Sequence, residues 1–147
     1  MKPIASWLAV AFVFHANLVM IAQESIASSV TCAVGEPDGR EFLLDRAEGR
    51  WRLSMRSTAT GNQWIRLMLP NAAPEIADGA ARLAYRNANG GRQVDLTVSA
   101  GRSSLDIWVD YGLEVNVEPD LDPRVDHMNT EGPLPNVTCK VLGSTPD

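Results

Sequence analysis

Apolar and polar residues alternate along most of the chain, with the two-residue period that is typical of half-buried β-strands. The longest such run extends from Leu105 to Val117, where every second residue is aliphatic or aromatic. Together with shorter runs it predicts eight strands, at residues 29–34, 40–45, 50–57, 63–69, 81–87, 92–99, 104–117 and 136–142. No long amphipathic helix is indicated, so the predicted fold class is all-β.

Turn-forming residues separate these strands by short links, and the clearest is the Asn87–Gly91 hairpin, because Asn-Gly accepts positive φ angles. Short links predict that successive strands pair antiparallel in a meander. With an even number of strands, the first and last could pair and close the sheet into a barrel. A two-sheet β-sandwich is the alternative for the same strands. Residues 70–79 and 118–135 are predicted loops, and the first could hold a helical turn over residues 74–77.

The two cysteines, Cys32 and Cys139, lie in the first and last predicted strands. An even count in an exported chain favours a disulfide over free thiols. A metal site is a poor alternative, because His127 is the only histidine after the first 27 residues. The two cysteines are also far too distant in sequence for a redox pair. We therefore predict one disulfide that joins the first strand to the last.

The first 27 residues have the order of a secretory signal, with Lys2, then an apolar run from Ile4 to Ala22, then small residues up to Ala27. Cleavage after Ala27 would leave a single β domain over residues 28–147. A membrane anchor is the alternative, since the run has about the length of a spanning helix, roughly 20 residues. Export predicts a periplasmic or secreted protein without a membrane span. The net charge of −5 argues against non-specific nucleic-acid binding.

Charged residues and two tryptophans fall on the phase opposite to the apolar one, which we expect to face outward. Arginines occupy the third to fifth predicted strands, at Arg50, Arg52, Arg56, Arg66, Arg82 and Arg86. Carboxylates occupy the sixth and seventh, at Asp95, Asp106, Asp110 and Glu114. An aromatic side chain on an exposed strand face is a candidate contact for a sugar or a protein. The candidate binding surface comprises Trp64, Arg66, Trp108, Arg50, Arg52 and Arg56.

Two plainer interpretations of this surface stay open. The charges could form an ordinary solvated surface whose ion pairs contribute little each. The tryptophans could be covered by the loops at residues 70–79 or 118–135, because tryptophan is highly buried on average.

Signatures of enzymatic or metal chemistry are weak. Asp120, Asp122, Asp126 and Glu131 have offsets similar to those of an EF-hand, but Val125 stands where that loop requires glycine. The sequence has no nucleophile elbow, phosphate loop or dinucleotide fingerprint. We predict no metal and no cofactor.

The function favoured by these features is a non-enzymatic exported module for binding or inhibition, expected to be a monomer, with an envelope protein or glycan as partner. One alternative is a structural or assembly subunit of an envelope complex, using Trp64 or Trp108. The other is a hydrolase of cell-wall material that uses His127 and nearby carboxylates. The predicted architecture resembles that of small periplasmic lysozyme inhibitors, which are eight-stranded barrels with a disulfide near their ends. That resemblance covers architecture alone and transfers no site residues.

Overall fold

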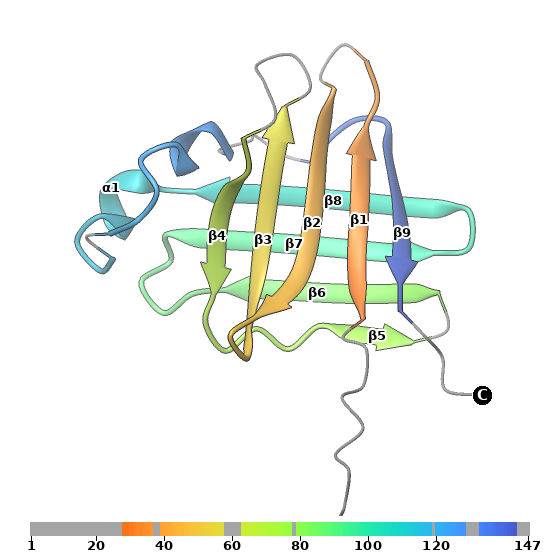
Figure 1. Ribbon diagram of the computed structural model, residues 1–147, viewed down its shortest axis with the longest axis horizontal. Helices are drawn as coiled ribbons and strands as arrows, with labels where there is room; N and C mark the ends of the chain where they lie inside the picture. Colours follow the sequence, from red (N-terminus) through yellow and green to blue (C-terminus); the bar gives the residue numbers. More distant parts are fainter. Residues whose placement is uncertain are drawn as a thin grey trace, which may run out of the picture.

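The computed structural model describes residues 28–36, 39–57, 63–77, 79–118, 120–128 and 133–143. These residues form two antiparallel β-sheets whose strands cross those of the other sheet (Figure 1). The predicted signal segment, residues 1–27, lies outside the described residues. The all-β fold class is confirmed.

The first sheet, sheet A, has the strand order β4-β3-β2-β1-β9. Its strands are β1 (Ser29–Val34), β2 (Arg40–Ala47), β3 (Arg50–Ser57), β4 (Ile65–Leu69) and β9 (Val137–Leu142). The second sheet, sheet B, has the order β5-β6-β7-β8. Its strands are β5 (Glu75–Ala77), β6 (Ala80–Arg86), β7 (Arg92–Ser99) and β8 (Arg102–Val109). Two short helices follow sheet B, α1 (Tyr111–Glu114) and the 3-10 helix η1 (Val125–Met128).

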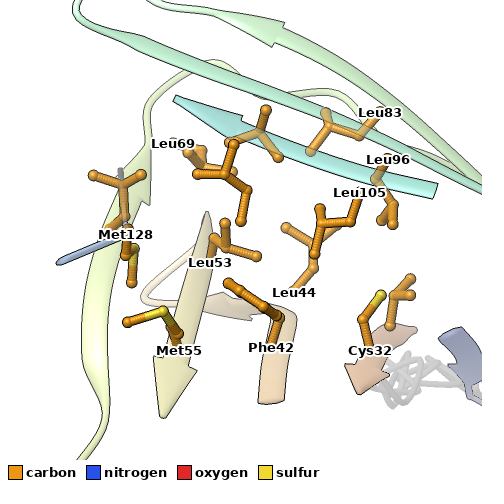
Figure 2. Close-up of a cluster of buried hydrophobic side chains, with 14 of the residues drawn as sticks. Cys32, Phe42, Leu44, Leu53, Met55, Leu69, Leu83, Leu96, Leu105 and Met128 are labelled. Carbon is orange, nitrogen blue, oxygen red and sulfur yellow. The ribbon is translucent and has the colours of Figure 1, made fainter. Parts of the chain in front are cut away.

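The core lies between the two sheets, because each strand turns its apolar phase toward the other sheet. Figure 2 shows Phe42, Leu44 and Leu53 of sheet A packed toward Leu96 and Leu105 of sheet B, all of them buried. Burial of one such side chain contributes about 1.5–3 kcal/mol. The alternation in the sequence therefore predicted the inner face of most strands correctly.

The disulfide prediction is confirmed, since Cys32 and Cys139 are bonded across a loop of 107 residues. The two cysteines lie directly opposite each other, because β1 and β9 are antiparallel neighbours in sheet A. The described strands nevertheless form two separate sheets and no closed barrel. The two-sheet alternative is thus the one that fits.

Two breaks in the meander explain why the barrel prediction is wrong. The chain leaves β4 through a turn at Asn71, which has a positive φ angle, and then starts sheet B at β5. The 118–135 segment later carries it from sheet B back to β9. Among the described residues, an isolated bridge joins Asp106 of β8 to Pro133. Pairing between β1 and β9 therefore completes sheet A and leaves the sandwich open elsewhere.

The predicted strand at residues 104–117 is wrong beyond Val109. The side chain of Asp110 accepts a hydrogen bond from the backbone N–H of Leu113 at 3.2 Å and so caps the start of α1. The helix turns Glu114 into the interior, whereas the strand phase predicted this residue to face outward. The helical turn considered for residues 74–77 is also wrong, because those residues contain β5.

Candidate functional site

The outer face of sheet A contains a hollow of about 510 Å³, which we call the sheet A hollow. Side chains of β1, β2, β3 and β9 and the tryptophan before β4 line it: Thr31, Ala33, Glu41, Leu43, Arg56, Trp64, Thr138 and Lys140. The register of the strands explains the grouping, because Ala33 lies opposite both Glu41 and Thr138, and Glu41 lies opposite Arg56. Cross-strand neighbours on one face lie about 4.5–5.5 Å apart at their Cβ atoms.

Trp64 and Arg56 form one side of this hollow. The Arg56 guanidinium lies over the Trp64 ring, 4.9 Å from its centroid, and also pairs with the Glu41 carboxylate. A cation over an indole face stabilises the pair by about 0.5–1 kcal/mol at an exposed site. Trp64 is half-buried. Its ring is therefore held in place while part of it stays open to solvent.

The disulfide lies directly beneath the other side of the hollow. Thr31 is the cross-strand partner of Lys140, and Ala33 is the partner of Thr138. Cys32 and Cys139 are the pair between them, with their side chains on the core face. The covalent bond thus fixes the register of the two strands that form this part of the hollow.

The charges of the hollow leave a positive excess. Arg56 and Lys140 are cationic, whereas Glu41 is the carboxylate among the lining residues, and it pairs with Arg56. Lys140 is exposed and has no ion pair with any residue that the structure describes. The hollow is therefore suited to an anionic group, which an ammonium can bind through a charge-assisted hydrogen bond.

Five of the six residues of the predicted binding surface lie on or beside sheet A, and the sixth does not. Arg52 lies beside the hollow and donates two hydrogen bonds to Asp45, at 3.0 and 2.7 Å, and these bonds raise the pKa of Arg52. Arg50 is the first residue of β3, and its guanidinium lies 3.9 Å from the carboxylate of Glu48. Arg66 is exposed on β4. Trp108 is half-buried on the outer face of sheet B, so the structure separates it from Trp64.

The predicted division between an arginine surface and a carboxylate surface is wrong for sheet B. Arg82 and Arg86 lie on β6, next to the strand that carries Asp95. The Arg86 guanidinium donates two hydrogen bonds to the Asp95 carboxylate, at 3.0 and 2.7 Å. Arg86 and Asp95 therefore neutralise each other on this face instead of belonging to two separate charged surfaces.

A second concave site, which the sequence analysis missed, is a pocket of about 800 Å³ at one end of sheet B, here called the Arg92 pocket. It lies between the turn after β4, the β6–β7 hairpin and the segment that follows α1. Figure 1 shows α1 and this hairpin at the same end of sheet B. Arg92 is 1% exposed and Glu114 is 0% exposed, and the two form an ion pair.

Several polar contacts surround this buried ion pair. Arg92 also pairs with Glu118 at 2.8 Å and donates a hydrogen bond to the backbone oxygen of Met68. The amide nitrogen of Asn87 donates to Glu114 at 2.7 Å, and the amide oxygen of Asn87 accepts from the backbone N–H of Arg92 at 2.8 Å. The network therefore joins both sheets to the hairpin and to α1.

Tyr85 is buried beside this network, and burial is the main cause that raises the pKa of its hydroxyl. Glu114 and Glu118 raise it further, and Arg92 opposes them. The Tyr85 hydroxyl makes no hydrogen bond with the residues that the structure describes. A buried polar group without a partner costs about 1–3 kcal/mol.

One signal in the sequence could have revealed the Arg92 pocket. Arg92 falls on the same phase as Val94, Leu96 and Val98, which predicts that it faces the core. An arginine at such a position requires a buried carboxylate partner. The sequence alone does not identify that partner as Glu114, because the apolar alternation continues through α1 as if it were a strand.

Gly91 provides the space that Glu114 occupies, and this gives a first testable prediction. A Cβ atom at residue 91 would collide with the Glu114 carboxylate, although the backbone there has no positive φ. We expect Gly91→Ala to lower the free energy of unfolding by about 1–3 kcal/mol, measured by urea denaturation. Gly35→Ala is the matched control, since the nearest atom to its Cβ would lie at an ordinary 3.6 Å. Equal effects of the two substitutions would contradict the packing at Gly91.

The segment with EF-hand-like offsets, for which no metal was predicted, is described only in part. Asp122 binds Arg124, with side-chain hydrogen bonds of 2.9 and 2.7 Å, and this lowers the pKa of Asp122. Arg124 also donates to Gln63 at 2.6 Å and so ties this loop to the start of β4. Glu131 lies outside the described residues, as do the side chains of Asp126 and His127. Within the described ranges, no three His, Cys, Asp or Glu side chains are placed to hold a metal ion.

The chain matches no protein-family model, no curated protein and no solved structure. The closed barrel on which the resemblance to lysozyme inhibitors rested is not the architecture of the described strands. In the part of the chain that the structure describes, no helix is long and apolar enough to span a membrane. The disulfide fits an oxidising compartment.

Proposed function

We propose that this protein is an exported, non-enzymatic binding protein whose sheet A hollow binds a carboxylated sugar of an envelope glycan. The observation that supports the proposal best is the placement of Trp64 and Lys140 at the same hollow, with the Cys32–Cys139 disulfide beneath it. An oxidising compartment, which the disulfide favours, agrees with the predicted signal at residues 1–27.

Each part of the hollow has a chemical counterpart in such a sugar. The apolar face of a pyranose ring can stack on the Trp64 indole. The carboxylate can accept a charge-assisted hydrogen bond from the Lys140 ammonium, about twice as strong as a neutral one. The Thr31 and Thr138 hydroxyls can exchange hydrogen bonds with sugar hydroxyls.

The dimensions of the hollow favour a small ligand over a protein partner. A volume of about 510 Å³ is within the range of sites for small molecules, roughly 300–1,000 Å³. A stable protein interface would instead bury about 800 Å² per partner over 20–30 residues. We therefore expect one or two sugar units to occupy the hollow.

The proposal predicts which substitutions weaken binding of trigalacturonate, a chain of three carboxylated sugars. Trp64→Ala removes the stacking surface and Lys140→Gln removes the uncompensated charge, so each should weaken binding by about tenfold, equivalent to about 1.4 kcal/mol. Isothermal titration calorimetry of the purified protein measures the change. Trp108→Ala is the matched control, because Trp108 lies on the outer face of the opposite sheet.

Two results would contradict the proposal. One is a wild-type protein that shows no binding of trigalacturonate at millimolar concentration. The other is a Trp108→Ala variant that loses as much affinity as Trp64→Ala. Binding of neutral trigalactose as strong as that of trigalacturonate would contradict the role of Lys140.

A further inference from the structure

We propose that the Arg92 pocket is a second ligand site, and that it binds a small organic cation with a primary ammonium group and a short alkyl chain. This pocket shares no lining residue with the sheet A hollow. The inference therefore does not depend on the proposed function, and its experiment can fail or succeed separately.

The charges at the pocket leave room for one further positive group. Arg92 is paired with two carboxylates, those of Glu114 and Glu118, so the three side chains carry one negative charge in excess. The Glu118 side chain is 35% exposed, whereas Glu114 is 0% exposed, so Glu118 is the carboxylate that a ligand can reach. Glu118 adjoins the buried side chains of Arg92 and Glu114, where the effective dielectric constant is lower than that of water. The attraction between the Glu118 carboxylate and a cationic ligand is therefore stronger than it would be in water.

Arg86 also lines the pocket, but it does not cancel this excess. Its guanidinium is bound to the Asp95 carboxylate by two hydrogen bonds, at 3.0 and 2.7 Å. Asp95 lies on the outer face of sheet B, so Arg86 and Asp95 form a separate neutral pair. The charge that a ligand meets is therefore that of Arg92 with its two carboxylates.

An independent observation that points to a ligand is the Tyr85 hydroxyl. Tyr85 lines the same pocket, is 5% exposed, and its hydroxyl has no hydrogen-bond partner within the described part of the chain. A primary ammonium has three donors and no acceptor, so it has enough donors for both the Glu118 carboxylate and the Tyr85 oxygen. A ligand at this position would satisfy the polar atom that the fold leaves unpaired.

The apolar lining residues of the pocket favour a ligand with an alkyl chain. Pro70, Ala72, Ala84 and Val117 present apolar surface to the pocket, and Val117 is 59% exposed although it is aliphatic. An exposed valine at the mouth of a polar pocket would be covered by the chain of such a ligand. The pocket volume of about 800 Å³ accommodates a chain of several carbon atoms.

The experiment measures binding of n-butylammonium to the purified protein by chemical-shift titration. We expect saturable shifts at residues of the Arg92 pocket. Glu118→Gln, which keeps the size of the side chain, should weaken binding by about tenfold. Tyr85→Phe, which keeps the packing, should weaken it several-fold and at the same time leave the free protein equally or more stable, because it removes an unpaired hydroxyl.

Butyrate and n-butanol are the ligand controls, since they keep the chain and replace the cation by an anion or a neutral group. Trp64→Ala is the control variant, because it alters the sheet A hollow and should leave butylammonium binding unchanged. Binding of all three compounds with equal affinity would overturn the proposal. So would an affinity for butylammonium that neither Glu118→Gln nor Tyr85→Phe changes.

Discussion

Replacing both Cys32 and Cys139 with alanine is expected to lower the free energy of unfolding by about 4.7 kcal/mol, the value for a closed loop of about 100 residues. The disulfide closes 107 residues and joins β1 to β9, so it restricts almost the whole described chain when unfolded. Typical domains have a stability of about 5–15 kcal/mol, so the variant should approach the limit of folding. Urea denaturation of wild type and variant measures the difference.

The cross-link has to be separated from the burial of two sulfur atoms. Cys32 and Cys139 are both buried, so the alanine pair also loses apolar contacts. Wild-type protein denatured with and without reductant keeps the same side chains and isolates the covalent bond. A loss below about 1 kcal/mol in that comparison would contradict the role assigned to the disulfide.

Arg92→Met is expected to lower the free energy of unfolding by about 3–5 kcal/mol, because it leaves the fully buried Glu114 carboxylate without its cation. The double variant Arg92→Met/Glu114→Leu should recover most of this loss, since replacing a whole buried ion pair by apolar residues is often neutral. The free energies of unfolding of the wild type, both single variants and the double variant, measured by denaturant unfolding, form a complete double-mutant cycle.

The exposed pair of Arg86 and Asp95 is the matched control for this cycle. Its side chains are 51% and 38% exposed, so its removal should change stability by about 0–1 kcal/mol. If Arg92→Met were no more harmful than Arg86→Met, the Arg92 network would not stabilise this end of the sandwich. If the double variant were as unstable as Arg92→Met, shape rather than charge would explain the loss.

Local sequence patterns predicted most of the strands and the strongest hairpin, because each of these depends on neighbouring residues, whereas the disulfide partners followed from the count of two cysteines. The alternation along 50–57 and 92–99 follows from one buried face per strand. The Asn87–Gly91 turn follows from the positive φ angle of Gly90. The pairing of β1 with β9 followed from the cysteines, which marked two distant strands as neighbours.

What the sequence did not predict depends on contacts between distant segments. Leu113, Val115 and Val117 continue the strand alternation, yet the Asp110 cap starts a helix there and leaves all three exposed. The buried partner of Arg92 lies 22 positions along the chain, beyond any local pattern. The division into two sheets likewise depends on where the chain crosses between them, which a strand count does not fix.

Trp64 and Trp108, which the sequence analysis assigned to one binding surface, show the same dependence on contacts between distant segments. Period-2 phase correctly placed Trp64 and Trp108 away from the core. Phase alone could not tell that they belong to different sheets and thus to opposite faces. Once the two sheets are distinguished, Trp64 with Lys140 becomes the candidate site and Trp108 becomes its control.

The most direct test of the central claim, that the sheet A hollow is the binding site, is a ¹H–¹⁵N correlation titration of the purified protein with trigalacturonate. We predict saturable shifts at the backbone amides of Thr31, Ala33 and Lys140 and at the Trp64 indole, with Trp108 unchanged. An absence of shifts at millimolar ligand, or shifts centred on Trp108 and the outer face of sheet B, would contradict it.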